Sequence, residues 1–118
     1  MNQSVFIRGR FPGLNEIIKT ARGNKFASAV EKKNHTERVR YSVLHLHPVE
    51  KADFIFTWYE KDKKRNKDNI SCGIKFCLDG LQAAGIIKND GWSQVLSITH
   101  HFEVSQNEGV LIEIIERA

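Results

Sequence analysis

Runs of alternating or continuous apolar residues predict four β-strands along the chain. The densest run of aromatic and β-branched residues is Ala52–Glu60, a composition that favours extended structure. A short apolar stretch at 4–10 also predicts a strand. Near the C-terminus, Val95–Val104 and 110–116 are rich in apolar residues, and the segment SQNEG between them has the Asn and Gly typical of a hairpin loop at 105–109. We therefore expect the last two strands to pair as a hairpin.

Helices are predicted between these strands. The first follows the turn FPGL, has Asn15 as its expected N-cap and is interrupted at 23–24. The second runs over about 25–45, and the clearest helix is 68–84, directly followed by a glycine that ends it. The order β-α-β-α-β-β predicts an α+β fold, with helices packed on a mixed sheet in a single small domain over 1–118.

The helix predicted at 68–84 has two distinct faces. At about 100° per residue, Asp68, Lys75 and Asp79 lie on one face, together with Cys72. The opposite face is apolar and is expected to pack on the sheet; it comprises Ile70, Ile74, Leu78 and Leu81. Purely structural roles remain open, with Asp68 as an N-cap and Lys75 and Asp79 as a helix-stabilising pair.

The distribution of charge is more informative than its total. The 118 residues carry a formal net charge of +4. Residues 1–51 hold ten Lys/Arg against four Asp/Glu, whereas 52–118 hold eight against ten, and five of those eight lie in the loop 61–67. Acidic residues within basic surroundings suit a metal site that also holds phosphates. For the basic run taken alone, a solvated surface loop is the favoured interpretation.

The composition excludes several classes of protein. No apolar run approaches the roughly 20 residues of a membrane helix, and the N-terminal residues lack the apolar core of a signal peptide. The only cysteines, Cys72 and Cys77, point to different faces of the predicted helix, so we expect no disulfide between them. We therefore expect a cytoplasmic protein that is not bound to a membrane.

Aromatic and histidine residues admit two interpretations. Trp58, Tyr59 and Trp92 are suited to stacking on unpaired bases, but aromatic residues beside apolar strands usually enter the core, and we expect a core role. His100 and His101 alternate within a predicted strand, so one should pack and the other should be solvated.

Four segments together resemble one known family. They are GRFPGLNE at 9–16, KRNKDNI at 64–70, KFCLDGL at 75–81 and AGIIKNDGW at 84–92. This ordered set is similar to the signature of the RusA-like Holliday-junction resolvases, which are small endodeoxyribonucleases often carried by phages and prophages. The resemblance covers most of the chain and predicts a RusA-like fold. It implies a Mg²⁺-dependent homodimer, with Mn²⁺ as a substitute metal, that resolves four-way DNA junctions by paired nicks in recombination and repair.

The resemblance also implies the site residues. Asp68 matches the second aspartate of the family's Asp-x-Asp pair, Asp90 matches the aspartate of the turn after the glycine, and Lys75 matches the family lysine, with longer spacing between Asn69 and Leu78. The first aspartate of the pair is replaced by Asn66. An amide offers Mg²⁺ a carbonyl oxygen but brings no charge.

Three consequences of Asn66 are open. The site works with an amide ligand, or Asp79 or Asp62 supplies the missing charge, or the protein binds junctions and cleaves them weakly or not at all. The expected metal ligands are thus Asp68, Asp90, Asn66 and Asp79, and the expected catalytic residues are Asp68, Asp90, Lys75 and Asn66.

Contacts with DNA phosphates are expected from basic and polar residues of the loop 61–67 and the N-terminal region. These are Lys61, Lys63, Lys64, Arg65, Lys67, Arg10 and Asn15. Two other classes remain open, namely a DNA-binding module without cleavage and a structural or interaction protein. No glycine-rich phosphate loop is present, so a nucleotide cofactor is not expected.

Overall fold

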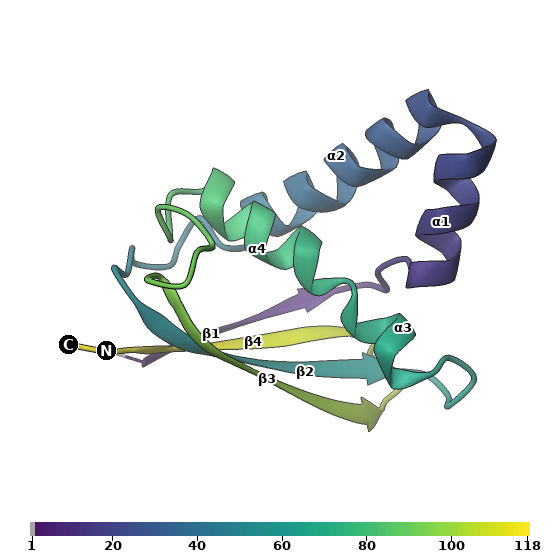
Figure 1. Ribbon diagram of the computed structural model, residues 1–118. Helices are drawn as coiled ribbons and strands as arrows, with labels where there is room; N and C mark the ends of the chain where they lie inside the picture. The colour runs from purple at the N-terminus through teal and green to yellow at the C-terminus, as the bar shows by residue number, and fades with distance from the viewer. Residues whose placement is uncertain (1) are drawn as a thin grey trace.

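The computed structural model describes residues 2–118 as one four-stranded sheet with helices on one face (Figure 1). This confirms the predicted α+β fold with a mixed sheet. Along the chain the elements are β1 (Asn2–Arg8), α1 (Leu14–Gly23), α2 (Lys25–Ser42), β2 (Ala52–Glu60), α3 (Lys67–Ser71), α4 (Ile74–Ala83), β3 (Val95–Val104) and β4 (Gly109–Glu116). The predicted bounds of β2 and β3 are confirmed to the residue.

The sheet has the strand order β1-β4-β2-β3. Strand β4 pairs antiparallel with both β1 and β2, whereas β3 pairs parallel with β2. The predicted hairpin between β3 and β4 is therefore wrong. The connection crosses the end of β2, where the N–H of Ser105 donates to the carbonyl of Glu60 (2.8 Å). Burial explains this order, because Val110, Ile112 and Ile114 of β4 are fully buried, while most side chains of β3 are exposed.

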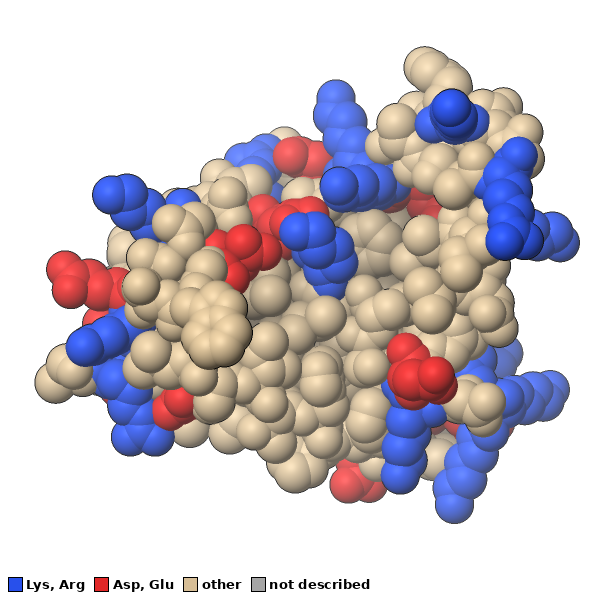
Figure 2. All heavy atoms as spheres, in the orientation of Figure 1, with Lys and Arg blue, Asp and Glu red and all other residues tan. Residues whose placement is uncertain are grey.

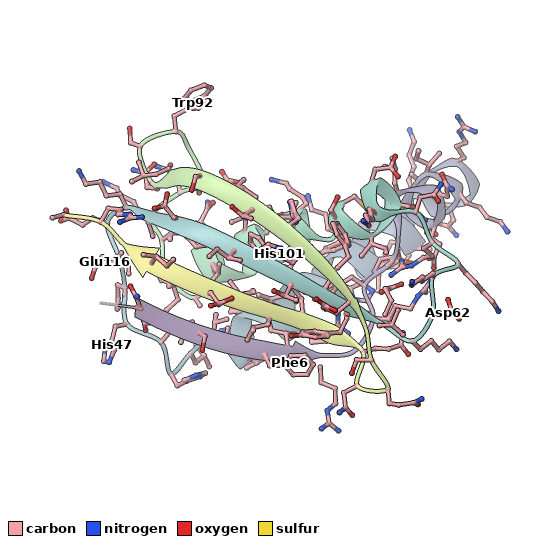
Figure 3. The ribbon with its side chains drawn as sticks, turned by 90° about the horizontal axis from the view of Figure 1, so that it is seen from below. Phe6, His47, Asp62, Trp92, His101 and Glu116 are labelled. Carbon is pink, nitrogen blue, oxygen red and sulfur yellow. The ribbon has the colours of Figure 1, made fainter. Side chains whose placement is uncertain are left out.

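The core lies between the sheet and the helices α2 and α4. Phe54 and Phe56 of β2 are its largest fully buried side chains, and Val39 of α2 and Leu81 of α4 are buried against the sheet. The helices approach closely at Gly80, where an added Cβ would overlap the side chain of Val39. The apolar face predicted for helix 68–84 is confirmed, because its four members are buried or packed against the core. The opposite face of the sheet is left uncovered by helices (Figure 3).

The entry to α1 differs from the prediction. Helix α1 begins at Leu14 with Gly13 as its N-cap, so Asn15 is not the cap. The N–H of Gly13 donates to the carboxylate of Glu16 (3.2 Å), which satisfies a backbone donor that lies outside the helix. The predicted interruption at 23–24 is confirmed, and the Asn24 side chain caps α2 by accepting the N–H of Ala27 (3.0 Å).

The single helix predicted at 68–84 is wrong, because it is divided into α3 and α4. Cys72 and Gly73 separate the two, and i to i−3 hydrogen bonds run through this turn from Gly73 to Ile70 and from Phe76 to Gly73. Packing favours glycine here, since a Cβ on Gly73 would lie 3.1 Å from the Trp58 ring. The glycine predicted to end the second part does so, because Gly85 has φ +77° and its N–H bonds back to Gln82 (3.0 Å).

The cysteine, tryptophan and histidine side chains were also the subject of predictions, and one of these is wrong. Both cysteines are free, and within residues 2–118 no helix has the length and apolarity needed to cross a membrane. Trp58 is buried as predicted, and His100 packs while His101 is exposed. Trp92 contradicts the expected core role, because its side chain is 97% exposed.

Candidate functional site

A lysine and two aspartates meet beside α4. Lys75, in the first turn of this helix, places Nζ 3.1 Å from Oδ1 of Asp79 and 3.6 Å from Oδ2 of Asp90. Asp79 lies one turn further along α4, whereas Asp90 belongs to the loop between α4 and β3. We call these three residues the Lys75 cluster. The structure thus brings together Lys75 and Asp90, two of the site residues that the resemblance implies.

The charges of the cluster reinforce one another. The hydrogen bond to Asp79 and the charge of its carboxylate raise the pKa of Lys75 above its ordinary value, and Asp90 adds to this, whereas burial opposes it. The lysine therefore remains a cation across the range in which proteins function. Acidic and basic side chains lie against one another on the face shown in Figure 2, with uncharged surface beside them.

The backbone around Asp90 is held in place by local hydrogen bonds. The side chain of Asn89 accepts the N–H of Gly91 (2.9 Å), and the carbonyl of Gly91 accepts the N–H of Val95 (2.9 Å). At the start of the loop, Ile86 and Ile87 are buried in the core. Asp90 is thus carried by a braced turn between α4 and β3, which positions its carboxylate toward Lys75.

Asp68 and Asn66 lie in a different place. They line an open groove with the loop after β2 and the end of β3, which we call the α3 groove; its acidic members besides Asp68 are Glu60, Asp62 and Glu103. No hydrogen bond or ion pair within residues 2–118 joins Asp68 to the Lys75 cluster. The turn at Cys72 and Gly73 is the cause, because i to i−3 bonding rotates about 120° per residue and ends the shared face predicted for a continuous α-helix.

Asp68 is also not an N-cap. The N-cap position of α3 belongs to Asn66, whose side chain makes no capping hydrogen bond. The carboxylate of Asp68 instead accepts the N–H of Asn69 (3.0 Å). Both Asp68 and Asn66 are exposed, so their oxygens face solvent in the α3 groove.

The four predicted metal ligands therefore form two pairs. Asp79 and Asp90 belong to the Lys75 cluster, and Asn66 and Asp68 belong to the α3 groove. Within residues 2–118, no group of three or more His, Cys, Asp or Glu side chains is placed to hold a metal ion. The donor chemistry of Asp79 and Asp90 nevertheless fits Mg²⁺. Both carboxylates contact the same ammonium group, that of Lys75, and Mg²⁺ keeps several waters beside one or two carboxylates.

Arg65, predicted to contact DNA, is engaged within the fold. Its guanidinium forms a two-pronged ion pair with Glu60 (2.9 and 2.8 Å) and donates to the carbonyl of Phe11 (3.0 Å). Burial opposes the charge, but the pairing with Glu60 raises the pKa of Arg65 overall. The side chain is only 12% exposed and ties the end of β2 to the segment before α1.

Some of the other residues predicted to contact DNA are bonded within the fold, and others are exposed to solvent. Arg10 pairs with Glu16 (2.8 Å), and the backbone N–H of Asn15 donates to the side chain of Asn69 (3.1 Å). Basic side chains project from the loop after β2, at the lower right of Figure 2. The exposed ones are Lys61, Lys63, Lys64 and Lys67.

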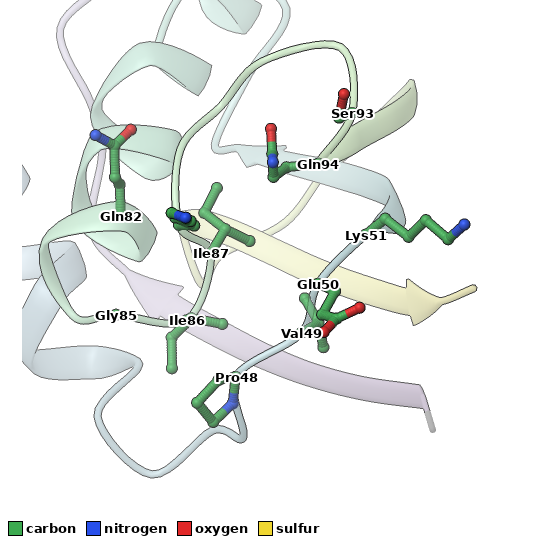
Figure 4. Close-up of a pocket in the computed structure, with 11 residues that line it drawn as sticks. Pro48, Val49, Glu50, Lys51, Gln82, Gly85, Ile86, Ile87, Ser93 and Gln94 are labelled. Atoms are coloured by element: carbon green, nitrogen blue, oxygen red, sulfur yellow. The ribbon is translucent and has the colours of Figure 1, made fainter. Parts of the chain in front are cut away.

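A second hollow lies next to the loop that carries Asp90. The segment 48–51, the end of α4 and the residues Ile87 and Gln94 line it (Figure 4). Its charged members, Glu50, Lys51 and Lys88, are of mixed sign, and the Lys75 cluster does not line it. Sequence reasoning did not anticipate this hollow, because its walls come from three separate segments.

Sequence reasoning also missed the exposure of Trp92. The available signal was its position directly after Asn89, Asp90 and Gly91, a composition typical of a turn. No family model matches the chain, and no curated protein matches it.

Proposed function

We propose that this protein is a Mg²⁺-dependent endodeoxyribonuclease that resolves four-way DNA junctions by paired nicks, as the RusA-like resolvases do. The observation that carries the proposal is the Lys75 cluster, in which Lys75 contacts Asp90 across the loop after α4. Both residues belong to the segments whose order resembles that family. A cytoplasmic homodimer of phage or prophage type is part of the same proposal.

The residues of the cluster have separable roles. Asp79 and Asp90 would hold Mg²⁺, or Mn²⁺ in its place. When bound, the metal would activate water and withdraw charge from a phosphate. Lys75, kept protonated by its neighbours, offsets the additional negative charge that develops on a phosphate during hydrolysis. The exposed lysines of the loop 61–67 contribute phosphate contacts that carry no sequence information.

Cleavage of a synthetic four-way junction tests the proposal. We expect nicking with Mg²⁺, none with EDTA, and a loss of about 100-fold or more in Asp79→Asn and Asp90→Asn. Asp68→Asn reports whether the α3 groove takes part: the total loss that the family signature implies would bring Asp68 into the site, and wild-type cleavage would leave it out. Glu50→Gln, an exposed acid outside the cluster, is the matched control. Wild-type cleavage by both Asp79→Asn and Asp90→Asn would overturn the assignment of this metal site.

A junction-binding protein with little or no cleavage is the second candidate. The specific observation in its favour is that no hydrogen bond or ion pair within residues 2–118 joins Asn66 or Asp68 to Asp90, so the predicted ligands are not gathered at one point. Gel shifts of a four-way junction and a linear duplex, with and without Mg²⁺, distinguish the two functions. Binding without cleavage, weakened by salt, favours this candidate. Absence of any junction preference favours an interaction protein instead.

The variant Asn66→Asp sharpens the distinction. It restores the family's Asp-x-Asp pair beside Asp68 in the α3 groove. A large gain in the cleavage rate would show that the native site lacks a ligand charge. An unchanged rate would show that the α3 groove does not limit cleavage.

A further inference from the structure

Trp92 projects from the molecule without covering any of it. The side chain is 97% exposed and points away from the ribbon (Figure 3). Tryptophan is usually among the most buried residues of a folded protein, since it has a large apolar surface to remove from water. Trp58, the other tryptophan, follows that rule with 2% exposure. The position of Trp92 therefore calls for an external partner.

The backbone holds Trp92 at the tip of a braced turn. Hydrogen bonds from Gln94 (3.2 Å) and Val95 (2.9 Å) to the carbonyl of Gly91 close the turn around it. At its base, the carbonyl of Gln94 accepts the N–H of Ala52 (3.0 Å), which ties the turn to β2. The backbone at Trp92 is thus already ordered, and less backbone conformational entropy is lost when the residue binds a partner.

The surroundings of the indole favour one planar ring as its partner over a protein interface. Its immediate neighbours on the turn, from Asn89 to Ser93, are small or polar, so the indole is an isolated apolar surface. A protein interface needs further buried apolar contacts around such an anchor, with a rim that excludes water. An aromatic ring that stands alone on the surface is instead suited to stacking on a nucleobase.

The position along the chain connects Trp92 to the Lys75 cluster. Asp90, whose carboxylate contacts Lys75, precedes Trp92 by two residues in the same braced turn. A base stacked on the indole would consequently belong to a nucleotide at or next to the phosphate held at that cluster. The two contacts would hold a nucleotide at both its base and its backbone.

We propose that Trp92 is a specificity-determining residue that stacks on an unpaired base next to the Lys75 cluster. This inference rests on the proposed DNA function and extends it, because it gives the protein a means to prefer branched over fully paired DNA. Bases at the centre of a branched junction unstack at lower cost than bases within a continuous duplex. A stacking residue beside the phosphate site therefore favours branched DNA.

The experiment combines binding with tryptophan fluorescence. A four-way junction, a single-stranded oligonucleotide and a linear duplex are titrated into wild type, Trp92→Ala, Trp92→Phe and the control Phe26→Ala. Phe26 is an exposed aromatic residue (78%) at the start of α2, remote from the loop after α4 (Figure 1). Because Trp58 is buried, fluorescence changes upon binding DNA report on Trp92.

We expect junction and single strand to quench wild-type fluorescence and the duplex to do so much less. Trp92→Ala should weaken junction binding by about tenfold, whereas Trp92→Phe should keep most of the affinity and lose the quenching. Phe26→Ala should behave as wild type. Junction binding by Trp92→Ala that equals wild type, in a wild type that does bind, would overturn the stacking role and leave the proposed function intact.

Two other results would contradict the inference in distinguishable ways. If wild type binds none of the three DNAs, the proposed function and the stacking role both fail. If Trp92→Ala changes the molar mass in light scattering without DNA while its junction affinity is unchanged, Trp92 contacts a second copy of the chain and no base. Circular dichroism of each variant confirms that the fold is kept, as expected for so exposed a side chain.

Discussion

The ammonium group of Lys75 lies 3.6 Å from the carboxylate of Asp90, which joins the first turn of α4 to the loop that follows the helix. The contact spans 15 residues of sequence and closes the loop back on the start of its own helix. A second carboxylate, from Asp79, lies 3.1 Å from the same group. The proposed phosphate site is therefore built from a local helical pair and one residue brought in by the loop.

Replacing Lys75 should separate metal binding from cleavage. In Lys75→Met the two carboxylates lose a competing cation, so Mn²⁺ should bind at least as tightly as in wild type. Cleavage of the junction should fall by about 100-fold, because the positive charge next to the phosphate is lost. Titration with Mn²⁺ and single-turnover cleavage measure the two effects. Lys19→Met, an exposed lysine of α1, is the control, and full cleavage by Lys75→Met would contradict the role given to the lysine.

Gly80 should be required for the close contact between α2 and α4. A methyl group there would overlap the side chain of Val39, so Gly80→Ala should lower the free energy of unfolding by about 1–3 kcal/mol. Urea denaturation measures this value.

Gly23, at the end of α1, provides the matched control for that substitution. No atom lies within 4 Å of a Cβ added there, so Gly23→Ala should leave stability unchanged or raise it slightly. Equal stability of the two variants would show that the helices separate without cost.

Replacing Arg65 should affect stability, whereas replacing its neighbour Lys64 should affect DNA binding. Arg65→Ala leaves the partly buried Glu60 without its partner, and we expect a loss of about 1–3 kcal/mol in the free energy of unfolding. Lys64→Ala should leave stability unchanged and weaken DNA binding, with a shallower salt dependence. Denaturation and gel shifts at several salt concentrations measure the effects; a stable Arg65→Ala protein that binds DNA weakly would reverse the assignment.

His100 should make stability depend on pH. Its Nδ1 accepts the indole N–H of Trp58 (2.9 Å), and burial lowers the pKa of the imidazole below its ordinary value of about 6.5. The unfolded chain therefore binds a proton more readily. Stability is fully present above about pH 6.5 and is lost as the pH falls through the lower pKa of the folded state. Burial and, to a lesser extent, the charge of Arg38 also lower the pKa of His35, so its protonation opposes folding in the same direction.

The variant His100→Gln tests this dependence, because it keeps an acceptor for Trp58 and removes the titration. Between about pH 6.5 and 4.5, its free energy of unfolding should fall less steeply than that of wild type. Urea denaturation across this range measures the slopes. Identical slopes would show that protonation of His100 does not oppose folding.

The sequence predicted individual elements better than their connections. The bounds of β2 and β3 followed from dense apolar and β-branched runs, and the break between α1 and α2 followed from Gly23 and Asn24. The hairpin between β3 and β4 was not formed. Turn composition at 105–109 is compatible with either a hairpin or a crossing connection, and burial of β4 decided between them.

The candidate site shows the same division. The pairing of Lys75 with Asp79 is a property of helical spacing and could be predicted from sequence. The helical face that they were predicted to share with Asp68 is interrupted by the turn at Gly73. Packing against Trp58 favours a glycine at this turn, and that contact is tertiary. Arg65 likewise belonged to a basic run in the sequence and became part of the fold through Glu60 and Phe11.

The sequence alone was enough to predict the α+β class, the apolar stripe of the region 68–84, the basic loop after β2 and the resemblance to a nuclease family, because all of these depend on residue types and their order along the chain. The folded structure was needed to show that the Asp90 carboxylate contacts Lys75 directly, that Asp68 lies in the α3 groove and that Trp92 faces solvent. These positions depend on how the loop and the helices pack on the sheet, and packing is a property of residues far apart in sequence.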